Sequence, residues 1–302
     1  ARSSTLAKEW LAPDPAVREV VYHHRRHRSR ENRVLGDEEN RRGERSFIRE
    51  LRSREFQRIF LFSERVKPAI HLWRAGIPVR AGYGHHPLQR ALLNTPPFIK
   101  PYRGPLAPRL FFNAAALTRA HGFLEDVPPP RLFIPEAILE RFEGAFSNLG
   151  AREVVAFGLG ASADWKNWGA QRFSALAETL AARGHAVLAL GGPAESDLAG
   201  DLRARLSEAA RGRVRPVISR SVLESAAMLR QCAWMVGNDT GILNVAAASG
   251  VRSLGLFGAT TPLSHDPEMQ AIQAKGMAAI STADVVAKLE GLGWLAGMDG
   301  GS

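Results

Sequence analysis

The second half of the chain alternates short apolar runs with stretches of helical period. Five runs have the length and aliphatic content of buried strands, at residues 154–158, 186–190, 214–218, 233–236 and 253–257. Helical patterns at 170–183, 195–210, 221–230 and 241–249 separate them. This alternation predicts an α/β fold, with a parallel sheet covered by helices on both faces. Ligands bind such sheets at the carboxyl ends of the strands, so we expect a site in the loops that follow them.

The first half is less regular. Apolar strand patterns at 58–62 and 78–82 and helical periods at 46–56 and 110–121 predict a second α/β domain, and the proline-rich segment 94–108 predicts a loop. Pro128, Pro129 and Pro130 mark a turn or linker. We place the domain boundary near residue 150, which gives domains 1–150 and 151–302, and expect a final helix at 284–295 that could pack on either of them.

The formal net charge of +10 predicts attraction to an anionic partner, and charge alone leaves nucleic acid, a phospholipid surface and a phosphorylated glycolipid open. Arginines crowd the first sixty residues among many acidic residues, which fits either a salt-bridged helix face or an anion-binding surface. No apolar run approaches the roughly 18 residues of a membrane span. A single cysteine excludes an internal disulfide, and the arginines around His23, His24 and His27 argue against a metal there. These features favour a cytoplasmic protein.

Small and hydroxyl-bearing residues follow the first strand pattern of the second half. The run Gly158-Leu159-Gly160-Ala161-Ser162 lets backbone amides approach an anion, and Lys166 adds a compact positive charge nearby. Together they suit a diphosphate, although a glycine after a strand is more often only a tight turn.

A second loop of this kind, Gly237-Asn238-Asp239-Thr240-Gly241, joins a strand to the helix that begins near 241. Asp239 or Thr240 could simply cap that helix, which is the likelier interpretation of this loop taken alone. Two further loops, 191–195 and 258–262, follow other strands, and Glu195 could either begin a helix or accept hydrogen bonds from a ribose diol. Because the strands are parallel, we expect all four loops to open onto one edge of the sheet.

Longer segments resemble one family. GASADWKNWGAQRF at 160–173, GGPAE, SVLESAAML and GNDTGILNVAAASGVRSLGLFGATTP are similar, in order and spacing over 151–262, to the donor domain of lipopolysaccharide heptosyltransferases, glycosyltransferase family 9. The first half resembles the acceptor domain of that family more loosely. The resemblance implies the GT-B architecture of two Rossmann-like domains with parallel sheets. It also implies an inverting, metal-independent transfer of a heptose or related sugar from a nucleotide-diphosphate donor such as ADP-heptose.

The resemblance also implies roles for individual residues. Ser162 and Lys166 would contact the donor diphosphate, Glu195 would hold the ribose, and Leu223, with nearby Val222, would lie beside the base. Asp239 would face the sugar, while Thr240 and Gly241 would offer a hydroxyl and amides to the phosphates. Asn244 stands where the family usually has a histidine, and Thr261 where it usually has an aspartate. Asparagine can hydrogen-bond a phosphate but carries no charge, so donor binding is expected to differ in strength or selectivity.

A larger departure concerns catalysis. In the family, the first strand of the acceptor domain ends in a glycine–aspartate loop, and that aspartate is the proposed general base. No residue of this sequence matches it, so the catalytic base is unassigned. We therefore expect an N-terminal domain that is incomplete at its start, in a truncated or pseudoenzyme form.

Together these patterns predict a glycosyltransferase that passes a heptose or related sugar to the anionic lipopolysaccharide core. Its basic first domain would associate peripherally with the inner face of the bacterial inner membrane. The alternative is a non-catalytic nucleotide-sugar-binding protein, which Asn244 and the missing base loop favour. Nucleic-acid binding is not expected, because the arginine-rich stretch lacks interleaved aromatic residues and any recognisable motif.

Overall fold

The computed structural model describes residues 9–20, 37–151, 153–219 and 221–295. The chain divides into two compact units: unit 1 contains Val17–Pro128, and unit 2 contains Glu9–Ala16 and the chain from Pro129 onward. The division falls earlier than the predicted boundary near residue 150. Its physical reason is that Arg131 pairs with the buried Asp266 carboxylate at 2.6 Å and Leu132 N donates to Ala248 O at 2.8 Å, which ties this segment to unit 2.

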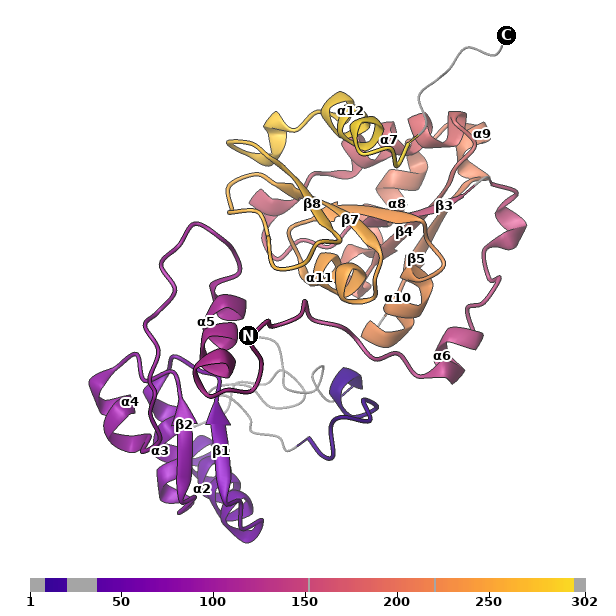
Figure 1. The fold of residues 1–302 in the computed structure, drawn as a ribbon. Coiled ribbons are helices and arrows are strands. Elements are labelled where there is room, and N and C mark those ends of the chain that lie inside the picture. The colour runs from indigo at the N-terminus through magenta and orange to yellow at the C-terminus, as the bar shows by residue number, and fades with distance from the viewer. Residues whose placement is uncertain (1–8, 21–36, 152, 220, 296–302) are drawn as a thin grey trace. The chain divides into compact units, whose positions relative to one another are not determined.

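Unit 2 contains a six-stranded parallel sheet in the order β5-β4-β3-β6-β7-β8 (Figure 1). The strands are β3 (Val154–Gly158), β4 (Ala186–Gly191), β5 (Val214–Ile218), β6 (Trp234–Asn238), β7 (Arg252–Phe257) and β8 (Met269–Gln273). This confirms the predicted parallel α/β sheet. The strand β8 was not predicted, because its sequence, MQAIQ, mixes polar and apolar residues as an edge strand allows.

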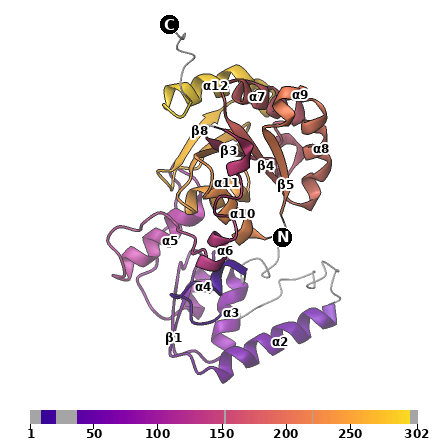
Figure 2. The ribbon, with the colours of Figure 1, turned by 90° about the vertical axis from the view of Figure 1, so that its right-hand side faces the viewer.

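Alternate residues of these strands point to opposite faces, and both faces are apolar. Val155 and Phe157 of β3 join a cluster with apolar residues of α7 (Ala170–Ala182), α8 (Ser196–Ala204), α9 (Glu208–Arg211) and α12 (Thr282–Gly291). Ala156 of β3 joins a second cluster with residues of α10 (Val222–Leu229) and α11 (Gly241–Ala248). Figure 2 shows α7, α9 and α12 together on one side of the sheet. The final helix α12 thus packs on unit 2, which decides between the two alternatives for its place.

Shorter elements complete unit 2. The helix expected over 195–210 is broken into a 3-10 turn, η3 (Pro193–Glu195), followed by α8 and α9, and Ser207 caps α9 by accepting a hydrogen bond from Ala210 N. Between Pro129 and the first strand lie α6 (Glu136–Glu140) and η1 (Ser147–Leu149). The turns η2 (Asp164–Lys166) and η4 (Met277–Ala279) follow β3 and β8.

Unit 1 has a smaller sheet than unit 2 in the described residues. Its two strands, β1 (Arg58–Leu61) and β2 (Val79–Gly82), pair in parallel, so each is an edge strand within the described residues. The helices are α2 (Asp37–Ser53), α3 (Val66–Arg74), α4 (Pro87–Leu92) and α5 (Arg109–Ala120). Small apolar clusters built around Leu72 and Leu117 hold these elements together. A two-stranded parallel sheet agrees with the α/β prediction for this half.

The arginines near the N-terminus were expected to form either a salt-bridged helix face or an anion-binding surface, and ion pairs decide between the two for some of them. Arg42 pairs with Glu38 at 2.5 Å within α2, and Arg54, directly after this helix, pairs with Glu50 at 3.1 Å; both pairs have the (i, i+4) spacing of a helix. For these positions the salt-bridged helix face is the observed arrangement. His23, His24, His27 and the arginines between 25 and 33 lie outside the described residues. No helix in the described ranges is long and apolar enough to cross a membrane.

Candidate functional site

The sheet of unit 2 has a switch point between β3 and β6. From β3 the chain proceeds through β4 to β5 on one side, and then through β6, β7 and β8 on the other. At the carboxyl end, Gly158 of β3 lies beside Gly237 of β6. A Cβ on Gly158 would lie 2.4 Å from Met235 Cε and 2.8 Å from Ile242 Cγ2, so only glycine lets α11 begin this close to the strands. Doubly wound sheets bind ligands at such a point.

Three of the predicted loops meet at the switch point. Lys166 Nζ, after β3, lies 2.5 Å from Asp239 Oδ2, after β6, and both side chains are less than one fifth exposed. Thr260 Oγ1, after β7, donates to the same carboxylate oxygen at 2.8 Å. The expectation that these loops share one edge is therefore confirmed. The contact brings a lysine, a carboxylate and hydroxyls together where a phosphate-bearing ligand would enter.

A buried asparagine holds the loop that carries Lys166. Asn238, fully buried at the end of β6, accepts a hydrogen bond from Trp168 N at 3.1 Å and donates to Leu159 O at 3.0 Å. The Trp168 indole is buried too, and it donates to Ile280 O at 2.8 Å. Asn238 was not among the predicted site residues. A buried amide at the end of an otherwise apolar strand is the signal that could have identified it.

Helix α11 begins at Gly241, two residues after the Asp239 carboxylate. Thr240 is its N-cap residue by backbone conformation, but its side chain makes no capping hydrogen bond, so the simple cap interpretation is not observed. Thr240 Oγ1 is buried and has no hydrogen-bond partner in the described part of the chain. Asn244 Nδ2 donates to Thr240 O at 3.3 Å, within the first turn of the helix. The first-turn amides from Gly241 and the unpaired hydroxyl can therefore both serve an anion.

The loops after β3 and β4 bring Ser162 and Glu195 to the same edge. Gly192 N donates to Glu195 Oε2 at 2.8 Å, so this glutamate caps the turn η3. A Cβ on Gly160 would lie 3.8 Å from Glu195 Oε1, which places the β3 loop against this carboxylate. Ser162 is exposed in the β3 loop. One glutamate oxygen thus holds the turn, and the other faces the loop of Lys166.

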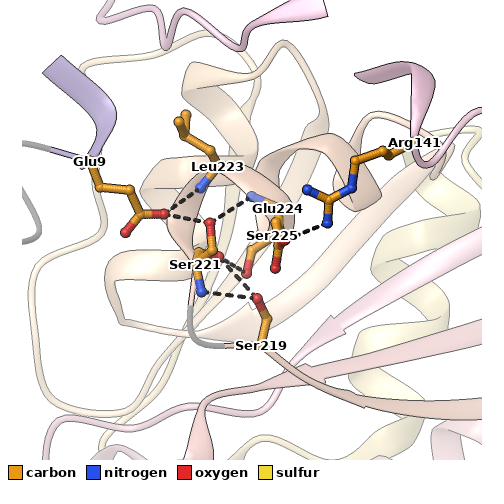
Figure 3. Close-up of polar contacts among 7 residues, drawn as sticks. All are labelled: Glu9, Arg141, Ser219, Ser221, Leu223, Glu224 and Ser225. Carbon is orange, nitrogen blue, oxygen red and sulfur yellow. Dashed lines mark hydrogen bonds and ion pairs between the residues drawn. The ribbon is translucent and has the colours of Figure 1, made fainter. Parts of the chain in front are cut away.

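The loop after β5 is closed by a residue from the start of the chain (Figure 3). Glu9 Oε1 accepts hydrogen bonds from Ser221 Oγ at 2.5 Å and from Leu223 N at 3.2 Å, at the first turn of α10. The Leu223 side chain is only 3% exposed. Arg141 pairs with Glu224 at 2.6 Å on the same turn. Nothing in the sequence near Glu9 predicts this long-range contact.

Unit 1 carries a polar cluster at the carboxyl ends of its own strands. Glu64 follows β1 and His85 follows β2, with 3.9 Å between His85 Nδ1 and Glu64 Oε1, and Asn113 of α5 donates to the same oxygen at 2.8 Å. Burial lowers the pKa of His85 and raises the pKa of Tyr83 to about 12. His85 Nε2 and the Tyr83 hydroxyl have no hydrogen-bond partner among the described residues. A neutral imidazole, a hydroxyl and a carboxylate are suited to binding sugar hydroxyls.

Metal ligands do not gather in the described ranges, which contain no group of three or more His, Cys, Asp and Glu side chains placed to hold an ion. The polar groups at the unit 2 edge are a lysine, hydroxyls, the first-turn amides of α11 and the carboxylates of Asp239 and Glu195. The lysine, the hydroxyls and the amides are groups that can bind a phosphate directly.

Sequence comparison identifies relatives over most of the chain. Residues 44–287 match the family model of glycosyltransferase family 9 (heptosyltransferase). Lipopolysaccharide heptosyltransferase 2 of Escherichia coli K12 is 26% identical over 227 residues, which are 71% of this chain and 65% of that protein. Lipooligosaccharide heptosyltransferase 2 of Haemophilus influenzae is 29% identical over 146 residues, 46% of this chain and 42% of that protein. The chain thus spans less than two thirds of the length of these relatives.

Solved structures have the same fold. A family 9 glycosyltransferase from Veillonella parvula superposes with a TM-score of 0.71 at 16% identity, covering 86% of this chain and 80% of that one. The Escherichia coli ADP-heptose lipopolysaccharide heptosyltransferase II gives a TM-score of 0.66 at 22% identity, covering 82% and 80%. This likeness confirms the predicted α/β fold of the GT-B type. Because the family model matches most of the length of this chain, the chain belongs to glycosyltransferase family 9, the heptosyltransferase family.

Proposed function

We propose that this chain acts as a glycosyltransferase that passes a heptose or related sugar from a nucleotide-diphosphate donor to the lipopolysaccharide core. One observation carries the proposal: Lys166 and Asp239 meet at the switch point of unit 2, beside the unpaired Thr240 hydroxyl and the first turn of α11. The relatives support the choice of donor, since one solved structure is an Escherichia coli heptosyltransferase with ADP-2-deoxy-2-fluoro heptose. An ADP-heptose-like donor is therefore the first to test.

The proposed donor contacts follow the order of the strands. Lys166, Ser162, Thr240 and the amides from Gly241 bind the diphosphate, with Asn244 in the same first turn. The Glu195 oxygen that faces the β3 loop accepts hydrogen bonds from the ribose hydroxyls. The first turn of α10, with Leu223, lies toward the base of the nucleotide. Asp239, which holds Lys166 before the donor arrives, then faces the sugar.

In the proposed reaction, an acceptor hydroxyl attacks the anomeric carbon of the donor sugar. The new carbon–oxygen bond forms as the bond to the diphosphate breaks, and attack from the opposite face inverts the anomeric configuration. Negative charge develops on the departing nucleotide diphosphate, where Lys166 and the α11 amides stabilise it without a metal ion. The proton of the acceptor hydroxyl must pass to a base, which the resemblance to the family does not assign to any residue of this chain.

The acceptor side of the proposal rests on unit 1. Its Glu64, His85 and Asn113 cluster offers hydrogen-bond partners to the hydroxyls of an acceptor sugar at the carboxyl ends of β1 and β2. An anionic lipopolysaccharide core suits the basic chain, and such an acceptor would place the protein peripherally at the cytoplasmic face of the inner membrane. Nucleic acid is not part of the proposed set of partners.

Nucleotide binding tests the donor site. Replacing Lys166 by alanine removes a charge-assisted contact, so the affinity for ADP in calorimetry should fall by about 10- to 100-fold. Lys288→Ala, on α12, removes the same charge away from the strand ends and should leave the affinity unchanged. Equal affinities for the parent chain and Lys166→Ala would remove this lysine from the site.

Turnover separates the proposal from its alternative. The parent chain should release ADP from ADP-heptose only when a lipopolysaccharide-core acceptor is present, and such turnover would contradict the pseudoenzyme expectation drawn from the missing base loop. Binding of ADP without any such turnover would instead support a non-catalytic nucleotide-sugar-binding protein.

A further inference from the structure

The positive charge of this chain is concentrated in one continuous segment. Residues 65–124 contain no aspartate or glutamate. The same sixty residues contain nine basic side chains, Arg65, Lys67, Arg74, Arg80, Arg90, Lys100, Arg103, Arg109 and Arg119. The formal net charge of residues 65–124 is therefore +9, compared with +10 for the whole chain. An anionic surface would be attracted to it over a distance set by the ionic strength.

Several of these cations already have partners within unit 1. Lys67 pairs with Glu44, Arg80 donates to Leu92 O at 2.7 Å, Arg90 to Gly84 O at 2.5 Å, and Arg119 to Glu125 O at 2.7 Å. Five of the nine, Arg65, Arg74, Lys100, Arg103 and Arg109, are exposed and have no side-chain hydrogen bond or ion pair in the described structure. Three of these five, Lys100, Arg103 and Arg109, lie within ten residues of one another and remain available to an external anion.

Two exposed leucines lie among Lys100, Arg103 and Arg109 in the sequence. Leu106 is 46% exposed and Leu110 is 63% exposed. Single exposed apolar side chains are common, but here two of them alternate with unpaired cations within eleven residues. We call Lys100, Arg103, Leu106, Arg109 and Leu110 the 100–110 surface. It combines positive charge with aliphatic side chains, which is the composition of a segment that lies on a membrane.

Figure 1 shows the course of the loop that leads into α5. Contacts within this loop and with α5 fix its shape. The Tyr102 ring stacks on Phe112 with 4.6 Å between ring centroids, and Tyr102 N donates to Asn113 Oδ1 at 2.7 Å. The Tyr102 hydroxyl accepts from Leu106 N at 3.2 Å. A Cβ on Gly104 would lie 2.2 Å from that hydroxyl, so the loop closes tightly around it. Little conformational entropy remains to be lost when such a loop binds a surface.

We propose that the 100–110 surface docks this protein onto a lipid bilayer that contains anionic phospholipids. The guanidinium and ammonium groups contact headgroup phosphates, and the two leucines enter the boundary between headgroups and acyl chains. A nucleic acid would match the charge but not the aliphatic leucines. The inference deepens the proposed function, since a lipid-linked acceptor lies at a membrane, yet its test needs no sugar transfer.

Vesicle flotation with the full chain tests the proposal. We expect the protein to float with vesicles of phosphatidylcholine mixed with phosphatidylglycerol, and not with vesicles of phosphatidylcholine alone. Binding should weaken as salt is raised, because the cations are exposed. No binding to the anionic vesicles would overturn the proposal. Binding of ADP by the same samples reports separately on the donor site, so failure of one idea is distinguishable from failure of the other.

Paired variants locate the surface. Arg103→Gln with Arg109→Gln should lower the partition coefficient on anionic vesicles by about tenfold. Leu106→Asn with Leu110→Asn should lower it by about tenfold or more, with the charge unchanged. The matched controls are Arg65→Gln with Arg74→Gln, which remove the same charge from exposed positions outside the surface, and Leu88→Asn, which changes a leucine that is 49% exposed.

Each remaining outcome overturns the proposal in its own way. If the control arginine pair weakens binding as much as the test pair, the attraction is that of diffuse net charge. If replacing Leu106 and Leu110 has no effect on binding, these side chains do not enter the boundary between headgroups and acyl chains. If the surface variants abolish binding to duplex DNA while vesicles are ignored in all samples, the surface belongs to a nucleic-acid interface.

Discussion

In unit 2 the buried indole nitrogens of Trp168 and Trp234 both donate to backbone carbonyls, whereas in unit 1 the buried Tyr83 hydroxyl has no partner among the described residues. The two strand-end sites differ in the same way. Asp239 already accepts hydrogen bonds from Lys166 and Thr260, but His85 Nε2 in unit 1 is unpaired. Each unit nevertheless keeps an unpaired buried polar atom at its strand ends, because Thr240 Oγ1 of unit 2 also has no hydrogen-bond partner in the described ranges.

The comparison teaches where to look for ligands in this fold. An unpaired buried polar atom costs about 1–3 kcal/mol, and a ligand that forms a hydrogen bond with it recovers part of that cost. Tyr83 Oη and His85 Nε2 follow β2, and Thr240 Oγ1 follows β6. These three atoms therefore lie at the carboxyl ends of parallel strands, which is where this class of sheet binds its ligands.

The largest expected effect tests the contrast between the two buried aromatic residues. Trp168→Ala removes a fully buried indole and its hydrogen bond, and should lower the free energy of unfolding by about 3–5 kcal/mol. Tyr83→Phe removes only an unpaired hydroxyl, and should change it by less than about 1 kcal/mol or raise it. Urea unfolding measures both, with Trp165→Ala as a control at a tryptophan that is 56% exposed. A cost for Tyr83→Phe equal to that of Trp168→Ala would end the contrast.

A smaller effect tests how tightly the strand ends of unit 2 are packed. Gly158→Ala places a methyl group 2.4 Å from Met235 Cε and 2.8 Å from Ile242 Cγ2, and should destabilise the protein by about 1–3 kcal/mol. Gly200→Ala, in α8, meets nothing within 4 Å and should stabilise it by about 0.5–1 kcal/mol. Thermal unfolding of the two variants should therefore shift in opposite directions. Shifts of the same sign would show that the strand ends can relax around a side chain.

The third prediction concerns pH and is given as a direction. Burial lowers the pKa of His85 in the folded chain; Glu64 raises it by a lesser amount, and Arg90 lowers it further. As the pH falls below about 6.5, the unfolded chain binds this proton before the folded chain does, so the stability of unit 1 decreases. An NMR titration of the imidazole should give a midpoint below 6.5, and His85→Gln should weaken the loss of stability in acid. A midpoint at or above 6.5 would contradict the burial argument.

Much of unit 2 could be predicted because each strand and helix there carries its own periodic pattern. The predictions for β3 and β5 matched in both bounds, whereas β8 was missed because an edge strand need not be apolar on both faces. The shared edge of the loops that carry Lys166 and Asp239 followed from the parallel order of the strands, whereas the ion pair between these two side chains was not predicted. The contact of Glu9 with Ser221 did not follow, since no local pattern reports on a pairing of residues 212 apart in the chain. The Glu64 and His85 cluster was missed for a similar reason, as each residue alone looks like part of an ordinary loop.

If a nucleotide diphosphate binds at this edge as proposed, the pairing of Lys166 with Asp239 has a consequence for its release. A phosphate that enters has to displace a carboxylate from the ammonium group, so it gains only the difference between two favourable contacts. When the nucleotide leaves, the Asp239 carboxylate pairs with Lys166 again, so neither half-buried charge is left without a partner. In the proposed reaction, an internal substitute of this kind would limit how tightly the product nucleotide is bound and would speed its release before the next donor.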